Sequence, residues 1–203
     1  MIKTIKLLAV FLFTVGFFAN SAFAQDIDEQ TQEGNKEAMF AAAEKKILKI
    51  NPELKWPNDI TIKGKKVAGV LVDTSIISNE IENMILGIGI NFKIKPYKLA
   101  NTIKKTPNFY GVTTLVKKNG NALPLVQQFL HELENVFHLI NSGRVKKIKN
   151  EWTKRSSTIG KNISIITNEG NLNGKAVKID SDGALIISKG KKTERILVGD
   201  IAK

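Results

Sequence analysis

Apolar and polar residues alternate along two stretches in the middle of the chain, and a period of two predicts β-strands. Residues 65–73 have two faces: Lys66, Ala68, Val70 and Val72 on one, and Val67, Gly69, Leu71 and Asp73 on the other. Residues 85–92 likewise have Leu86, Ile88, Ile90 and Phe92 opposite Gly87, Gly89 and Asn91. Glycines in a strand permit close approach of a ligand or of a packed helix, and spacing alone favours neither.

The residues around these strands predict further elements. The alanine-rich stretch 36–50, with Asn35 as its N-cap and Pro52 closing it, predicts a helix. Residues 54–56 are expected to enter the sheet, because Pro57 excludes a helix interior. Ile60 and Ile62 alternate with polar residues, which indicates a short strand. The basic stretch 93–116, with its two prolines, predicts loops along a sheet edge.

The second half of the chain changes from a helical to a strand pattern. Apolar residues recur every three or four positions over 124–140, which predicts an amphipathic helix. His131 and His138 on this helix are expected at its surface rather than in a metal site. Residues 144–149 predict a solvated basic helix face, with partner docking as the alternative. Short strands over 162–167, 174–179, 184–188 and 193–198, separated by turns, predict a small β-barrel.

The sequence of residues 1–24 predicts a targeting segment. Two lysines precede a continuous apolar run, and Ala22-Phe23-Ala24 has the form of a cleavage site. We therefore expect a signal-peptide-like leader over 1–24 and a polar linker over 25–35, with a buried N-terminal strand or helix as the alternative. A used leader would make the protein exported or membrane-associated.

Composition narrows the chemistry. The chain has 203 residues, a formal net charge of +12 and no cysteine. The absence of cysteine excludes disulfides, thiolate metal sites and cysteine catalysis. The positive charge suits nucleic acid, a membrane surface or an acidic protein. Nucleic acid is the weaker option, because no zinc-ligand spacing or arginine-rich arm occurs in the sequence.

The densest group of chemically specific residues is Lys55-Trp56-Pro57-Asn58-Asp59, which directly precedes the first alternating strand. Lys66 stands beside an alanine on a mostly apolar strand, and an ammonium group there requires water or an anion. Gly87-Ile88-Gly89 opens no helix, so it is not a dinucleotide-binding fingerprint.

Together these motifs resemble the biotin protein ligases. Lys55 to Asp59 looks like the family's Lys-Trp-Pro-Asn-Asp signature, residues 65–73 resemble its lysine-bearing strand, and Gly87-Ile88-Gly89-Ile90-Asn91 resembles its third motif. Further similarity lies in Val112-Thr113-Thr114-Leu115, Trp152, residues 157–161 and residues 180–185. The resemblance covers roughly residues 36–203 and implies an α+β fold. In this fold a mixed β-sheet with helices on one face (36–155) precedes a small SH3-like β-barrel (156–203).

The resemblance also implies a reaction, ATP-dependent biotin–protein ligation. The biotin carboxylate attacks the α-phosphate of ATP, giving biotinyl-AMP and pyrophosphate, and a carrier-protein lysine then takes the biotin. By family analogy Lys66 and Asp59 are catalytic, with Lys66 holding the carboxylate and α-phosphate and Asp59 helping to hold Mg²⁺. The residues expected to bind biotin or the adenylate are Trp56, Asn58, Lys66, Gly69, Gly87, Gly89 and Asn91. An exposed turn carboxylate is the alternative for Asp59, and plain core packing for Trp56.

The chain departs from the family pattern in one respect. Biotin ligases carry a Gly-Arg-Gly-Arg-type loop upstream of the tryptophan signature, and no Gly-Arg-Gly occurs here. We therefore expect impaired adenylation. The alternatives are a non-catalytic exported binding module with the ligase fold, or a lipoate ligase-like protein. Family expectation is a cytoplasmic enzyme whose partner is the biotin carboxyl carrier domain of a carboxylase. No DNA-binding module is expected, and a homodimer is left open.

Overall fold

The structure, a computed structural model, describes residues 52–77, 80–105, 109–116, 121–167 and 170–202. The predicted leader (1–24), the linker (25–35) and the helix expected over 36–50 lie outside the described residues. None of the helices in the described part is both long and apolar enough to cross a membrane.

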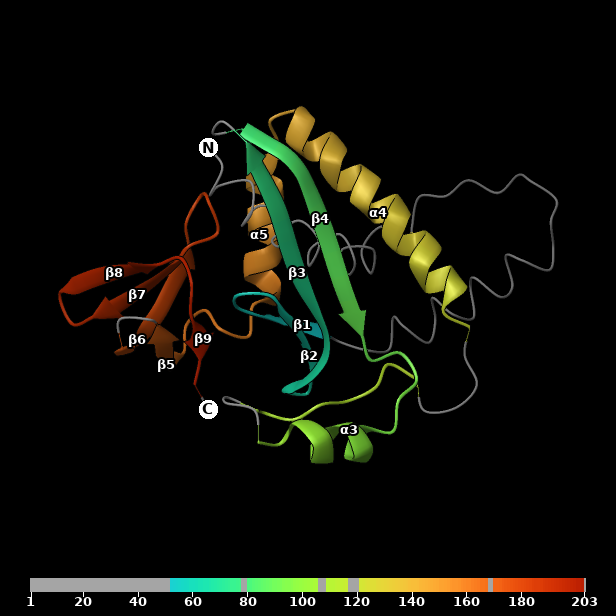
Figure 1. The fold of residues 1–203 in the computed structure, drawn as a ribbon. Coiled ribbons are helices and arrows are strands. Elements are labelled where there is room, and N and C mark those ends of the chain that lie inside the picture. The colour runs from blue at the N-terminus through green and yellow to red at the C-terminus, as the bar shows by residue number, and fades with distance from the viewer. Residues whose placement is uncertain (1–51, 78–79, 106–108, 117–120, 168–169, 203) are drawn as a thin grey trace.

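The first half of the described chain forms a four-stranded sheet (Figure 1). Its strands are β1 (Pro52–Lys55), β2 (Asp59–Ile62), β3 (Lys65–Ile77) and β4 (Glu80–Ile90), in the order β1-β2-β3-β4. Neighbouring strands pair antiparallel throughout. Parallel contacts in the described residues are two isolated bridges, Leu54 with Ser156 and Lys66 with Val112. The predicted strands are confirmed, and β3 and β4 are longer than expected: β3 continues beyond residue 73 to Ile77, and β4 begins before residue 85, at Glu80.

A β-bulge changes the faces predicted for β3. Ile60 of β2 pairs with Ala68, whereas the next residue, Thr61, pairs with Lys66, so Val67 is the extra residue. Strict alternation predicted Lys66 on the same face as Ala68. That prediction is wrong, because the bulge turns the Lys66 side chain onto the face of Gly69, where it lies over the glycine. Val67 and Ala68 are both buried as a result.

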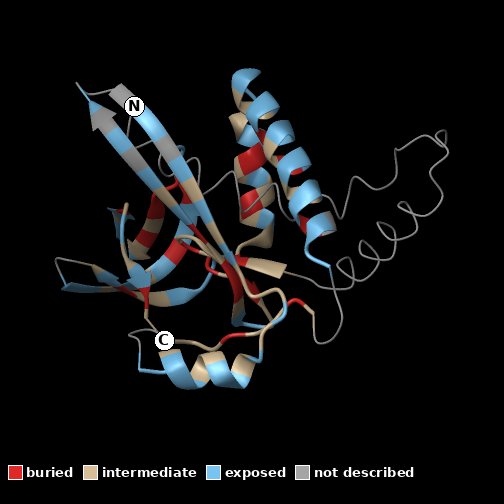
Figure 2. Cartoon of the chain, turned by 45° about the vertical axis from the view of Figure 1, so that its right-hand side comes forward, coloured by how far each residue is buried: buried red, intermediate tan, exposed pale blue. Residues whose placement is uncertain are grey.

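The described residues form three helices beside this sheet: α3 (Pro96–Ile103), α4 (Leu123–Asn141) and α5 (Val145–Arg155). The expectation of loops throughout 93–116 is wrong, because Pro96 begins α3; proline is tolerated in the first helical turn, where its missing N–H costs nothing. The helix predicted over 124–140 is confirmed as α4. Helices α4 and α5 lie on the same side of the sheet, as predicted (Figures 1 and 2).

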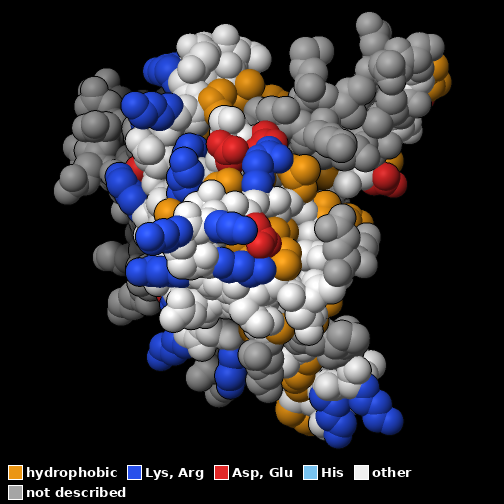
Figure 3. Space-filling view, turned by 90° about the vertical axis from the view of Figure 1, so that its left-hand side faces the viewer, with side chains coloured by type: hydrophobic (Ala, Val, Ile, Leu, Met, Phe, Trp, Pro, Cys, Tyr) orange, Lys and Arg blue, Asp and Glu red, His pale blue; other side chains and the backbone are white. Residues whose placement is uncertain are grey.

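The C-terminal part forms a five-stranded antiparallel sheet in the order β8-β7-β6-β5-β9. The strands are β5 (Asn162–Thr167), β6 (Gly170–Ile179), β7 (Leu185–Lys189), β8 (Lys192–Ile196) and β9 (Asp200–Ile201). The four predicted strands are confirmed within a few residues. Closure into an SH3-like barrel stays a prediction, since β8 and β9 are the two ends of the described sheet. Lys and Arg side chains spread over this side of the molecule (Figure 3).

The two sheets share one apolar core. Leu54, Ile60 and Val67 of the first sheet belong to the same buried cluster as Ile148 and Trp152 of α5 and the inner residues of the second sheet. The backbone also joins them, because Ser157 N–H donates to the Leu54 carbonyl at 2.8 Å. The start of the C-terminal part therefore supports β1, the strand that leads into the tryptophan motif.

Candidate functional site

One row of residues crosses all four strands of the first sheet. Lys55 of β1 pairs with Asp59 of β2, Asp59 with Gly69 of β3, and Gly69 with Gly89 of β4. Residues that pair across neighbouring strands share a face. The row therefore places two charged side chains beside two glycines, and all four were singled out from the sequence motifs.

The Lys66 ammonium lies over Gly69 and beside Asp59, two members of this row. Its Nζ lies 2.5 Å from Asp59 Oδ1, and the Lys66 side chain retains 40% exposure against 14% for Asp59. A methyl group built on Gly69 would approach Lys66 Cε to 2.9 Å and Asp59 Oδ1 to 3.2 Å. The ion pair thus occupies the space that the missing Gly69 side chain leaves free. The structure therefore brings together Lys66, Asp59 and Gly69, as the resemblance implies.

Tyr110 is a member of the site that sequence reasoning missed. Its hydroxyl donates a 2.6 Å hydrogen bond to Asp59 Oδ2, and its ring lies 4.1 Å from Lys55 Nζ. The segment that carries Tyr110 is held on β3, because Lys66 N–H donates to the Gly111 carbonyl and Thr113 N–H to the Lys66 carbonyl. No local pattern around Tyr110 signals this role. It depends on a contact between residues 51 positions apart.

Burial and charge shift two pKa values in this group. Burial lowers the pKa of the Lys55 ammonium from its ordinary 10.5, while the charge of Asp59 opposes the change and that of Lys66 adds to it. Burial, then the charge of Asp59 and the hydrogen bond to it, raise the pKa of Tyr110 well above its ordinary value. The phenol thus stays protonated and continues to donate to Asp59 at neutral pH.

Asn58 and Asn91 fix the backbone on either side of Lys66. Asn58 Nδ2 donates to the Val70 carbonyl at 2.7 Å, and Val70 N–H donates back to the Asn58 carbonyl at 3.0 Å. Asn91 Nδ2 donates to the Lys66 carbonyl at 3.3 Å. Both side chains therefore hold β3 in place through its main chain. Their direct contact with a ligand stays a prediction.

Trp56 is buried between the two sheets, with 2% of its surface exposed. Its backbone N–H donates to Thr158 Oγ1, and its indole Nε1–H donates to the Gly183 carbonyl, each at 3.1 Å. This arrangement matches the alternative considered for Trp56 in the sequence, a core residue that packs without contacting a ligand. The indole anchors the motif to the C-terminal sheet and offers a ligand almost no surface in this conformation.

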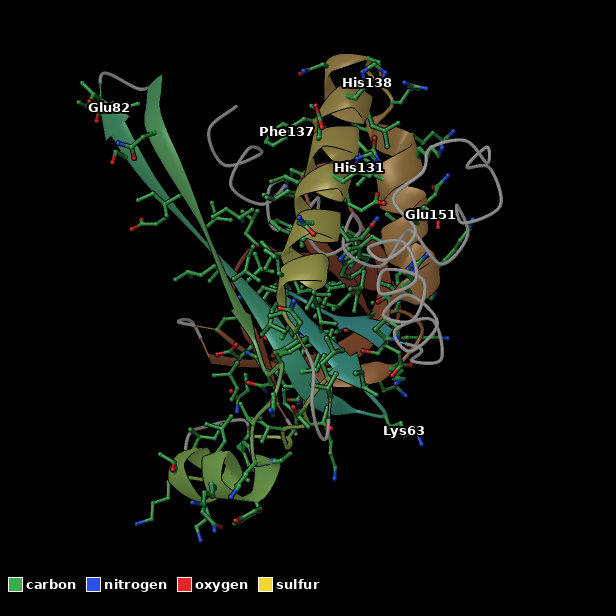
Figure 4. The ribbon with its side chains drawn as sticks, turned by 90° about the vertical axis from the view of Figure 1, so that its right-hand side faces the viewer. Lys63, Glu82, His131, Phe137, His138 and Glu151 are labelled. Atoms are coloured by element: carbon green, nitrogen blue, oxygen red, sulfur yellow. The ribbon has the colours of Figure 1, made fainter. Side chains whose placement is uncertain are left out.

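The glycine face of β3 and β4 is open. Gly87 and Gly89 are exposed, and no described helix covers them, so close helix packing does not explain them. Leu71 pairs with Gly87 beside the Gly69–Gly89 pair, and its side chain is 69% exposed. Helix α4, with the exposed His131 and His138 labelled in Figure 4, lies on the opposite side of the sheet. An exposed floor of Leu71, Gly87 and Gly89 therefore extends from the ion pair along β3 and β4, toward Asp73.

The expected metal role of Asp59 stays a prediction. Both carboxylate oxygens are engaged, one by Lys66 and the other by Tyr110. Among the described residues no group of three or more His, Asp and Glu side chains could hold a metal ion. A direct Asp59–Mg²⁺ bond would require one of these two contacts to break.

Two sequence families match the chain. The biotin/lipoate A/B protein ligase family matches residues 11–91, and the biotin protein ligase C terminal domain matches residues 158–203. The first match begins inside the segment predicted as a leader. Together the two matched regions cover more than half of the chain.

Curated relatives agree with these matches. The bifunctional ligase/repressor BirA of Bacillus subtilis is 29% identical over 155 residues, which are 75% of this chain and 46% of that protein. The biotin--[acetyl-CoA-carboxylase] ligase of Paracoccus denitrificans is 29% identical over 138 residues, which are 66% of this chain and 55% of that protein. The chain spans about half the length of the curated relatives it matches.

Solved structures establish the same fold. The apo biotin protein ligase of Aquifex aeolicus superposes with a TM-score of 0.67 at 22% identity, covering 98% of this chain and 76% of that one. The same enzyme in complex with biotin and ATP gives a TM-score of 0.65 at 21% identity, covering 97% of this chain and 70% of that one.

Proposed function

The chain belongs to the biotin protein ligase family, and from this premise we propose that it takes part in the ATP-dependent attachment of biotin to a lysine of a carrier protein. The reaction would pass through biotinyl-AMP. The Lys66–Asp59 pair above Gly69 is the observation that carries the proposal, because it places a fixed cation on an open face of the sheet.

The ion pair suits the charge that develops during adenylation. As the biotin carboxylate attacks the α-phosphate, negative charge spreads over the phosphate oxygens and the departing pyrophosphate. A cation already held in place stabilises this charge without reorganising. Asp59 supplies the restraint on Lys66, and the 40% exposure of Lys66 leaves its ammonium within reach of a ligand.

The floor beside the ion pair suits the rest of the vitamin. Leu71 and Gly87 continue the same face, and Ile85, opposite Asp73, is 65% exposed. An aliphatic chain that ends in a carboxylate would bury apolar surface against Leu71 while its carboxylate meets Lys66. We therefore assign Gly69, Gly87 and Gly89 to the ligand floor.

Magnesium is assigned no protein ligand in this proposal. Both oxygens of Asp59 are engaged, so Mg²⁺ would arrive bound to the phosphates of ATP, which commonly supply most of its non-water ligands in nucleotide enzymes. Asp59 would act by holding Lys66. The partner we propose is the biotin carboxyl carrier domain of a carboxylase, with no DNA. We propose an SH3-like barrel for the C-terminal sheet.

The test uses the full chain with biotin, ATP and Mg²⁺, and measures pyrophosphate release and biotinyl-AMP. Lys66→Ala is expected to lower the rate by about 10²–10³-fold, as for the loss of one preorganised electrostatic contact. Lys65→Ala is the matched control, because Lys65 is the neighbouring exposed lysine, and its rate is expected within about twofold of the original.

Binding is measured separately by calorimetric titration with biotinyl-AMP or a stable mimic. Tight binding that Lys66→Ala abolishes supports the proposal even where turnover is slow. A folded chain without affinity for biotin or the adenylate contradicts the proposal and favours a non-catalytic binding module. Selective binding of lipoyl-AMP instead would place the chain with the lipoate ligases.

A further inference from the structure

Tyr110 contacts both Lys55 and Asp59, the partner of Lys66, and the sequence motifs did not predict this position. Its hydroxyl donates to Asp59 Oδ2 at 2.6 Å, on the carboxylate edge that Lys66 leaves free. Asp59 is thus held from two directions, by a hydrogen bond and by an ion pair. A carboxylate fixed in this way has little freedom to rotate and release the ammonium group.

The other side of Tyr110 supports Lys55. The Lys55 ammonium lies 4.1 Å from the centre of the Tyr110 ring, within the range of a cation–π contact. Lys55 forms no ion pair within the part of the chain that the structure describes. Burial is the largest cause of its lowered pKa, and the charges near it also act on this pKa: Asp59 and Asp200 raise it, and Lys66 lowers it.

These contacts leave the group with an excess of positive charge. Lys55 and Lys66 contribute two ammonium groups, and Asp59 contributes one carboxylate. The charges of Asp59 and Asp200 favour the charged form of the partly buried Lys55, but its desolvation outweighs them. An anionic ligand group that reached both lysines would supply the missing counter-charge.

We propose that Tyr110 is a positioning residue of this site: its hydroxyl locks Asp59 onto Lys66 while its ring supports Lys55, so that both lysines act on one anionic group of the ligand. The identity of that group, the carboxylate or α-phosphate that reacts in biotin adenylation, rests on the proposed function. The Tyr110–Asp59–Lys66 contact, called the lock below, does not depend on the proposed function.

The lock can be tested without any ligand, because the chain has two tyrosines. Tyr97 is 62% exposed, and Tyr97→Phe leaves Tyr110 as the phenol that the absorbance follows. Burial, then the charge of Asp59 and the hydrogen bond to it, raise the pKa of Tyr110. The phenolate absorbance of the Tyr97→Phe chain, followed against pH, should therefore rise only above the ordinary phenol pKa of about 10.

Asp59→Asn is the variant that decides in this titration whether Asp59 holds the Tyr110 hydroxyl. Removing the carboxylate charge should shift the late phenol toward ordinary pH, and Tyr110→Phe should eliminate it. A Tyr110 phenol that ionises near the ordinary pKa of about 10 in the folded Tyr97→Phe chain would overturn the lock, as would an unchanged late step in Asp59→Asn. Circular dichroism at each pH confirms that the chain is still folded. If it unfolds first, the ring resonances of Tyr110 at neutral pH, compared between the original chain and Asp59→Asn, report the same contact.

The effect on ligand binding is measured with biotinyl-AMP. Tyr110→Phe keeps the ring below Lys55 but removes the hydroxyl, and is expected to weaken binding about tenfold, as for the loss of a hydrogen bond to a charged group. Tyr110→Leu removes both contacts and should weaken binding further. Tyr97→Phe is the matched control and should leave the affinity unchanged.

A purely structural role gives a different result. In that case Tyr110→Phe would lower the unfolding midpoint while the affinity stayed within about twofold, and the proposal would fail. An original chain that shows no affinity for biotinyl-AMP contradicts the proposed function instead. The phenol titration then still decides whether Tyr110 locks Asp59.

Discussion

Every strand of the C-terminal sheet contributes at least one buried apolar side chain, whereas none of the described side chains of β4 is buried. Strand β3 buries Val67, Ala68 and Val70 near its start and then exposes Leu71 and Ile77. The C-terminal sheet thus buries side chains from all of its strands in the core that the two sheets share, and the first sheet leaves one face open. This openness leaves the candidate site accessible to a ligand.

The charged clusters of the two sheets differ in the same way. In the C-terminal sheet Arg195 pairs with Asp180 and Asp182, and Lys189 pairs with Glu194, so these cations have carboxylate partners. In the first sheet Asp59 forms its ion pair with Lys66, and the Lys55 ammonium lies over the Tyr110 ring. An ion pair alone therefore does not mark a site. The distinguishing feature is a partly buried lysine that forms no ion pair among the described residues and lies beside an open glycine floor.

The largest expected effect on stability concerns the core that the two sheets share. Leu185 is fully buried in β7, so Leu185→Ala should lower the free energy of unfolding by about 2–5 kcal/mol through lost burial and a cavity. Leu71→Ala, at a 69% exposed position, should change it by no more than about 0.5 kcal/mol. Urea unfolding of both variants measures the contrast. Similar losses would show that the β3–β4 face is also part of a packed core.

The junction of the two sheets should show an intermediate effect. Trp56→Phe keeps an aromatic ring but removes the indole N–H that donates to the Gly183 carbonyl. A buried carbonyl left without its donor costs about 1–3 kcal/mol, and urea unfolding should show a loss in this range. Thr158→Val, which removes the hydroxyl that accepts from Trp56 N–H, should have a similar cost. Unchanged stability in both variants would mean that the C-terminal sheet does not anchor the motif.

Gly69→Ala should affect binding more than folding. The added methyl group would approach Lys66 Cε and Nζ to 2.9 and 3.0 Å, and the flexible lysine end can move away. Stability should fall by less than about 1 kcal/mol, while affinity for biotinyl-AMP should fall by about tenfold or more because Lys66 leaves Asp59. Gly89→Ala is the matched control for the steric effect on Lys66, since its methyl group would meet only the Gly69 carbonyl, at 4.0 Å. If the two variants lose the same affinity for biotinyl-AMP, the loss comes from the added methyl group on the glycine floor and not from displacement of Lys66.

The sequence pattern predicted most elements and the three motifs that meet at the site, because period and motif wording are local properties. It misplaced the Lys66 side chain, since a β-bulge at Val67 is set by how β2 pairs with β3. It missed Tyr110 and the anchoring of Trp56 by Thr158 and Gly183 for the same reason. Those contacts join residues far apart in the chain, and no local spacing encodes them.

The smallest expected effect lies in the balanced cluster of the C-terminal sheet. The backbone N–H of Ser181, followed by Arg195, lowers the pKa of Asp180 from its ordinary 3.8. A carboxyl group whose pKa is lower in the folded chain stabilises the fold above pH 3.8 and loses this contribution as the pH falls through its folded value. Since the Asp180 side chain is 39% exposed, solvent screening keeps the contribution below about 1 kcal/mol.

Asp180→Asn should therefore reduce stability slightly at neutral pH, and the difference from the original chain should disappear in strong acid. Urea midpoints of the two proteins, compared from neutral pH to below the ordinary carboxyl pKa, measure this trend. A difference that grows in acid would contradict the assigned sign. A loss of several kcal/mol at neutral pH would show that the C-terminal cluster is not a solvent-screened pair. The contrast with the partly buried group around Asp59 would then no longer separate the two sheets.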